Sequence, residues 1–106
     1  MTDKAVQAFI EKKIAQVDWS KSDLHGEARV NWAYSNERND GYYGVCIDAG
    51  MNGSGKWSDY MSSVADLLSK IEEDIPDVVV SDLWTDFIDD VFSVTLDFPL
   101  DKLAAL

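Results

Sequence analysis

The chain has 106 residues, of which 46% are hydrophobic, enough for one domain with an apolar core. Its formal net charge of −11 is repelled by phosphate backbones and anionic lipids, so direct binding to nucleic acid or to a membrane is not expected. The single cysteine excludes an internal disulfide framework, and no signal peptide or membrane-length apolar run is evident, so we expect a reduced, cytoplasmic setting.

The first half of the chain predicts a helix followed by a β-hairpin. Apolar residues recur at helical spacing from Val6 to Val17, which predicts an amphipathic helix over about residues 3–17. After a connecting loop, alternating runs at 27–35 and 43–49 flank a polar segment that ends in Asp-Gly. Two such runs joined by a turn-forming segment are typical of an antiparallel hairpin.

The second half predicts two helices and a strand. Ser58 is a candidate N-cap for a helix with this apolar face: Met61, Val64, Ala65, Leu68 and Ile71, with Leu67 beside it. The sequence leaves residues 78–91 open between helix and strand. The β-branched residues 78–80 fit a short buried strand, whereas residues 81–91 fit a helix better, with an apolar stripe opposite four aspartates. Residues 92–98 alternate and predict a strand, and the apolar tail at 101–106 has room for one helical turn.

This order of elements, α-β-β-α-α-β, predicts an α+β fold. We expect a small antiparallel sheet of about three strands, covered by helices on one face, within a single acidic domain over residues 1–106. No internal repeat is evident in the sequence.

The charge is divided unequally between the two halves of the chain. Residues 1–56 carry eight acids and seven bases, whereas residues 57–106 carry twelve acids and two bases, Lys70 and Lys102. Unpaired like charge destabilises a compact state, so we interpret the acidic second half as a surface kept for a strongly basic partner.

The acidic run supplies the predicted partner-binding residues. The segment 81–91 uses Asp, a poorer helix former than Glu, and as a helix it would place like charges four residues apart, each pair costing about 0.2–0.5 kcal/mol. Short carboxylates on a rigid helix would form a fixed array suited to a groove that binds phosphates. The predicted residues are Glu72, Glu73, Asp74, Asp77, Asp82, Asp86, Asp89 and Asp90. The alternative is a solvated face that only keeps the protein soluble.

Candidate catalytic motifs are incomplete. The segment 50–56 satisfies G-x-x-x-x-G-K, but Trp57 stands where a phosphate loop needs Ser or Thr to hold magnesium. Cys46 lies mid-strand and His25, the single histidine, lies in a loop, so neither a nucleophile pair nor a zinc site is expected. We therefore expect no enzymatic activity, no metal and no cofactor.

In charge, size and lack of a catalytic motif, the chain resembles the small acidic inhibitors that phages and mobile elements use against host defence nucleases, of the anti-CRISPR and antirestriction type. It is also similar to immunity proteins that neutralise nuclease toxins. The resemblance implies a non-enzymatic nucleic-acid mimic that blocks a basic surface of a nuclease or defence complex. The alternative is a homodimeric structural or regulatory module, with Trp32, Tyr42 or Tyr43 in its interface.

Overall fold

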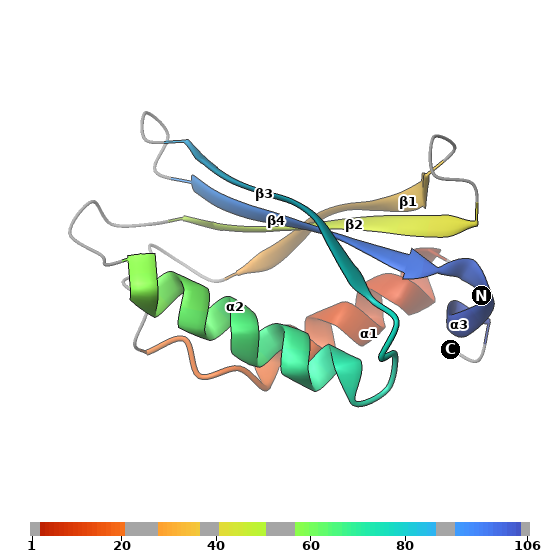
Figure 1. Cartoon of the computed structure of the whole chain (residues 1–106), viewed down its shortest axis with the longest axis horizontal. Helices are drawn as coiled ribbons and strands as arrows, with labels where there is room; N and C mark the ends of the chain where they lie inside the picture. Colours follow the sequence, from red (N-terminus) through yellow and green to blue (C-terminus); the bar gives the residue numbers. More distant parts are fainter. Residues whose placement is uncertain (1–2, 21–27, 37–40, 51–56, 87–90, 105–106) are drawn as a thin grey trace.

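Two helices cover one face of a four-stranded antiparallel sheet in the computed structural model, which describes residues 3–20, 28–36, 41–50, 57–86 and 91–104 (Figure 1). The elements are α1 (Asp3–Ala15), β1 (Arg29–Asn36), β2 (Tyr42–Gly50), α2 (Trp57–Glu72), β3 (Val79–Asp86), β4 (Val91–Pro99) and the one-turn α3 (Leu100–Leu103). The strand order is β1-β2-β4-β3. The predicted α+β class, with helices on one face of a small antiparallel sheet, is confirmed, with one strand more than expected.

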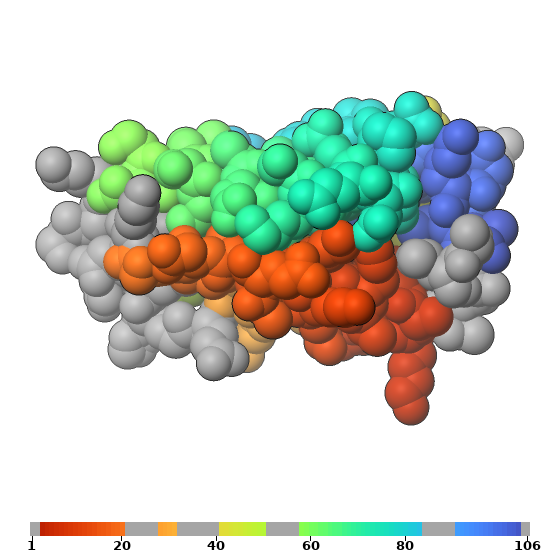
Figure 2. All heavy atoms as spheres, turned by 90° about the horizontal axis from the view of Figure 1, so that it is seen from below, coloured from red at the N-terminus to blue at the C-terminus, as the bar shows by residue number. Residues whose placement is uncertain are grey.

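The core lies between the sheet and the helices, which pack side by side (Figure 2). The buried apolar residues of α2 are Tyr60, Val64, Leu67 and Ile71, whereas Met61 is 40% exposed. The predicted apolar face of this helix is therefore rotated: Leu67 lies at its centre. The Tyr60 ring stacks on Phe92 of β4 with centroids 6.1 Å apart, and this contact turns α2 toward the sheet.

The predicted hairpin is confirmed as β1 and β2, which pair antiparallel from Asn36↔Tyr42 to Arg29↔Asp48. Gly41 precedes β2 with a φ of +90°, a conformation that glycine adopts without the steric cost of a Cβ. Its carbonyl accepts a 2.8 Å hydrogen bond from the amide of Leu100, which ties the hairpin to the start of α3.

The prediction of a helix over residues 81–91 is wrong. Residues 79–86 form β3, paired antiparallel with β4 from Val79↔Asp97 to Asp86↔Val91, and residues 87–90 lie outside the described part of the chain. The segment satisfies both periods, its β-branched and aromatic residues favour a strand, and pairing with β4 decides in favour of the strand. On a strand, residues four apart are separated by about 13 Å, so Asp82 and Asp86 do not face each other across a helical turn.

The structure contains a repeat that the sequence prediction missed. The N-terminal unit (α1, β1 and β2) and the C-terminal unit (α2, β3 and β4) have the same order of elements. The edge strands β1 and β3 each have eight residues, the inner strands β2 and β4 each have nine, and equivalent positions are 50 and 49 residues apart, respectively. Each edge strand shifts register at the equivalent place, between Val30 and Trp32 and between Val80 and Asp82.

The pairing of the inner strands relates the two units by an approximate twofold axis. The β2–β4 register is symmetric about the pair Cys46↔Thr95, because each pair on one side has an equivalent pair on the other. Three pairs of equivalent buried positions on the inner strands carry similar side chains. These are Tyr43 and Phe92, Val45 and Val94, Ile47 and Leu96. On the helices and just beyond them, buried equivalents are Val6 and Tyr60, Ile10 and Val64, Lys13 and Leu67, and Val17 and Ile71.

Candidate binding surface

Four of the predicted partner-binding acids lie around the C-terminal end of α2. This acidic turn consists of Glu72, Glu73, Asp74 and Asp77, all exposed. The amides of Glu73 and Asp74 donate to the carbonyls of Ser69 (3.3 Å) and Ile71 (3.1 Å), so the backbone continues in a helix-like turn beyond α2. The local backbone therefore presents these carboxylates to solvent in a short, hydrogen-bonded segment.

Acids are electrostatically disfavoured at this position. The C-terminal end of a helix carries a partial negative charge, which disfavours each nearby carboxylate by about 0.3–1 kcal/mol. Lys70 does not form an ion pair with the acids of this turn, because its Nζ binds Asp66 one helical turn earlier, at 2.8 Å. Within the described residues, neither Glu72 nor Glu73 forms an ion pair.

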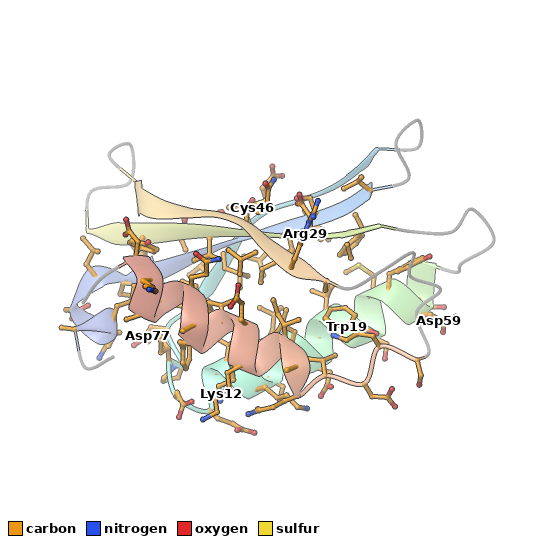
Figure 3. All side chains as sticks on the ribbon, turned by 180° about the vertical axis from the view of Figure 1, so that it is seen from behind. Lys12, Trp19, Arg29, Cys46, Asp59 and Asp77 are labelled. Atoms are coloured by element: carbon orange, nitrogen blue, oxygen red, sulfur yellow. The ribbon has the colours of Figure 1, made fainter. Side chains whose placement is uncertain are left out.

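The other two acids of the turn have cationic partners. Asp74 Oδ2 lies 2.7 Å from Lys13 Nζ, and the Lys13 side chain is only 8% exposed, so this carboxylate compensates a buried ammonium of α1. Asp77 Oδ2 lies 3.6 Å from Lys102 Nζ in a pair that is half exposed on both sides, and such surface pairs contribute little. Asp74 thus has a structural role, and Asp77 remains accessible; Figure 3 labels it at the turn after α2.

The remaining predicted acids do not extend this turn as one helical face. Asp82 lies on β3, is exposed, and accepts a 2.9 Å hydrogen bond from the amide of Leu83. Asp86 is the last residue of β3, and the described part of the chain does not include its side chain; Asp89 and Asp90 lie outside the described residues altogether. The predicted helical array is therefore replaced by two elements, the acidic turn and an edge strand.

The edge strand exposes apolar side chains that the sequence analysis did not assign to a surface. The β3 edge, defined here by Val79, Val80, Asp82 and Leu83, contains valines that are 50% and 42% exposed and a leucine that is 40% exposed. Residues 78–80 were expected to be buried. The β-branched run predicted a strand, but it did not predict that this strand lies at the edge of the sheet. Position could have been found only from the pairing of β2 with β4, which places β3 outside.

Opposite the helices, the sheet carries a small polar cluster. Cys46 and Arg29 lie on this face (Figure 3). Ser93 Oγ donates to Asp48 Oδ1 at 2.6 Å, and Cys46 Sγ lies 3.1 Å from Ser93 Oγ and 3.4 Å from the same Asp48 oxygen. Burial raises the pKa of the Cys46 thiol, which keeps it protonated near neutral pH. The cluster is hydrogen-bonded internally, and His25 lies outside the described residues.

The aromatic residues suggested for a homodimer interface divide. Tyr43 is 1% exposed, and its hydroxyl donates to Asp3 Oδ1 at 2.6 Å, so it belongs to the core. Tyr42 is 37% exposed, and the described part of the chain omits the Trp32 side chain. Of the described pair, only Tyr42 is available for contact with a second molecule.

The remaining features of the described residues are a small hollow and scattered acids. A hollow of about 250 Å³ is lined by Asp18, Ser62, Ser63 and Asp66, but Lys70 already binds Asp66. Three or more side chains placed to hold one metal ion are not found in the part of the chain that the structure describes. In the same part, none of the helices has the length and apolar character needed to cross a membrane.

Comparison with family models, with curated proteins and with solved structures finds no significant match to this chain in any of the three.

Proposed function

We propose that this chain is a non-enzymatic acidic protein that binds a basic, nucleic-acid-binding surface of a partner protein and blocks it. The partner class is a nuclease or a nucleic-acid-binding defence complex, as for inhibitors of the anti-CRISPR or antirestriction type, and the setting is the cytoplasm. A nuclease toxin neutralised by an immunity protein would present the same chemistry.

The observation that carries the proposal is the charge difference between two units of the same architecture. The half that contains the N-terminal unit has eight acids and seven bases, whereas the half that contains the C-terminal unit has twelve acids and two bases. Because the N-terminal unit forms the same α-β-β arrangement with nearly balanced charge, the backbone plan does not require the acids. Self-repulsion makes them a cost to folding, and binding to a cationic surface would offset it.

The position of the acids supports the same conclusion. Glu72 and Glu73 lie where the helix dipole disfavours them, and within the described residues they form no ion pair. Asp77, in the turn after α2, and Asp82, on β3, are also exposed. Glu72 and Glu73 have no ion pair among the described residues that a cationic partner would have to break, and steering by the net charge would make association fast and salt-sensitive.

The proposal is tested by capture and displacement. The immobilised chain is incubated with host lysate at low salt, bound protein is eluted with a salt gradient, and the purified captured protein is tested for binding to a labelled DNA or RNA duplex. We expect the chain to displace the duplex. The variant Glu72→Gln/Glu73→Gln should inhibit about tenfold less well, a loss of about 1.4 kcal/mol.

The matched control is Glu11→Gln/Asp18→Asn, which removes two exposed acids from the N-terminal half of the chain. Its net charge equals that of Glu72→Gln/Glu73→Gln. It should inhibit like the wild type. Equal losses in both double variants would reduce the effect to net charge and overturn the assignment of the surface. A captured protein that binds no nucleic acid would overturn the proposed function.

A further inference from the structure

We infer that the β3 edge receives an extended, basic segment of the partner, which adds to the sheet as a further strand. The inference rests on the proposed function, because the basic character of the partner is taken from it. It assigns a binding mode, main-chain pairing with β3, in addition to charge attraction at the acidic turn.

The outer side of β3 has the features of a strand-addition site. Its neighbour in the sheet is β4, and no strand among the described residues pairs with its other side. Edge strands that expose backbone donors and acceptors are templates for an incoming chain, and proteins usually protect them with lysine, proline or a covering element. The described part of β3 has two protective features, the irregularity between Val80 and Asp82 and the charge of Asp82, and that charge favours a basic segment.

The equivalent strand of the N-terminal unit is better covered on the face that carries the core. Helix α1 approaches the backbone of β1 closely, whereas α2 does not approach β3 to the same extent. Val30 of β1 packs against the core, but Val80, its equivalent on β3, is 42% exposed. The two units thus place the same residue type in two environments, and only the C-terminal unit leaves it available for contact.

The two faces of β3 are chemically different. Val80 and Leu83 pair with Leu96 and Val94, so they share the face that carries the core. Asp82 pairs with Thr95 and lies on the opposite face, which Val79, paired with Asp97, shares. A strand added beside β3 would therefore meet apolar side chains on one face and a carboxylate on the other, which suits a segment in which apolar and basic residues alternate.

Charge selects a basic segment over a second copy of this chain. Antiparallel pairing of β3 with itself would bring Asp82 and Asp86 of two chains, each with a net charge of −11, onto one short ladder. A lysine or arginine would instead pair with Asp82. The present hydrogen bond from the Leu83 amide to Asp82 is local, so an incoming carbonyl can replace it and release the carboxylate for a cation.

The test uses a nine-residue peptide, acetylated and amidated, in which lysine and valine alternate. Calorimetry and amide hydrogen exchange are measured on the full chain at low and high salt. We expect salt-sensitive binding and slowed exchange at amides within 79–86. Leu83→Lys should weaken binding about tenfold more than Met61→Lys, a control that adds the same charge at a residue of equal 40% exposure on α2.

A second peptide with N-methyl groups on alternate backbone amides separates pairing from charge attraction. It should bind much more weakly than the parent peptide, because its methylated amides cannot donate hydrogen bonds to the backbone carbonyls of β3. Equal binding of both peptides, equal effects of the two lysine variants, or self-association of the free chain through β3 would overturn the inference. Protection confined to residues 72–77 would do the same while leaving the proposed function intact. Protection of β3 combined with failure of the displacement experiment would support the edge site and reject the proposed function.

Discussion

The N-terminal unit and the C-terminal unit bury similar residues and expose different ones. Ile47 and Leu96 occupy equivalent core positions at 3% and 0% exposure, yet Val30 packs against the core and Val80 is 42% exposed. The exposed acids of the acidic turn have no counterpart of similar density in the N-terminal unit. The comparison separates two kinds of information: buried pairs at equivalent positions specify the α-β-β arrangement, and the surface residues are free to specify binding.

The strongest test of the comparison is truncation at equivalent core positions. Ile47→Ala and Leu96→Ala should each lower the free energy of unfolding by about 3 kcal/mol, because both leave a cavity on the same side of the sheet. Urea unfolding measures both. A loss in one variant that is several times the loss in the other would show that the units do not contribute equally to one core.

A smaller effect is expected at the ion pair that joins the units. Asp74→Asn should destabilise by about 1–2 kcal/mol, because it weakens the 2.7 Å contact to the buried Lys13 ammonium. Lys13→Leu places the residue type of the equivalent Leu67 in the N-terminal unit and should cost little or stabilise. In that background Asp74→Asn should lose its effect. If Asp74→Asn destabilised the Lys13→Leu variant as much as it destabilises the wild type, measured by the same unfolding curves, the ion-pair explanation would be contradicted.

Tyr43→Phe also makes one unit resemble the other, since Phe92 occupies the equivalent position. Loss of the hydrogen bond to Asp3 should cost about 1 kcal/mol at pH 7. Burial and the Asp3 contact raise the pKa of Tyr43 above its ordinary value of about 10. The folded state therefore holds this proton after the unfolded state releases it, and wild-type stability should fall as pH rises above about 10. Thermal unfolding across this range should show a shallower fall for the variant; parallel curves would reject the assignment.

The smallest effect is expected at the acidic turn. Glu72→Gln/Glu73→Gln should raise the free energy of unfolding by about 0.3–1 kcal/mol at low salt, because it removes charge from the C-terminal end of α2. The gain should vanish in 1 M NaCl, where charges are screened within about 3 Å. Glu11→Gln, midway along α1, is the control and should change stability less. A loss of stability in the double variant would show that these glutamates support the fold.

Much of the fold could be predicted because several segments have an unambiguous hydrophobic periodicity. Residues Val6 to Val17 keep helical spacing over several turns, and residues 92–98 alternate without interruption, so both elements were confirmed. Residues 81–91 satisfy both periods over a short length, and the choice was decided by pairing with β4, a contact between segments that the sequence order does not reveal. The repeat was missed because equivalent positions carry similar rather than identical residues, at spacings of 50 on the edge strands and 49 on the inner strands.

The candidate site was predictable in composition and not in arrangement. The excess of acids after residue 70 is a count, and the structure leaves Glu72, Glu73, Asp77 and Asp82 exposed as expected. The neutralisation of Asp74 depends on Lys13, which lies 61 positions earlier in the chain, and on its burial by tertiary packing. The apolar part of the β3 edge depends on which strand the sheet leaves outermost, a property of topology.

The pair Cys46↔Thr95, on the approximate twofold axis, has a consequence for experiments on this protein. A substitution at either position is adjacent to both units at once, whereas a substitution elsewhere on β2 or β4 has an equivalent position on the other strand that stays unchanged. Every off-axis measurement therefore comes with an internal reference in the same molecule, at the same concentration and temperature.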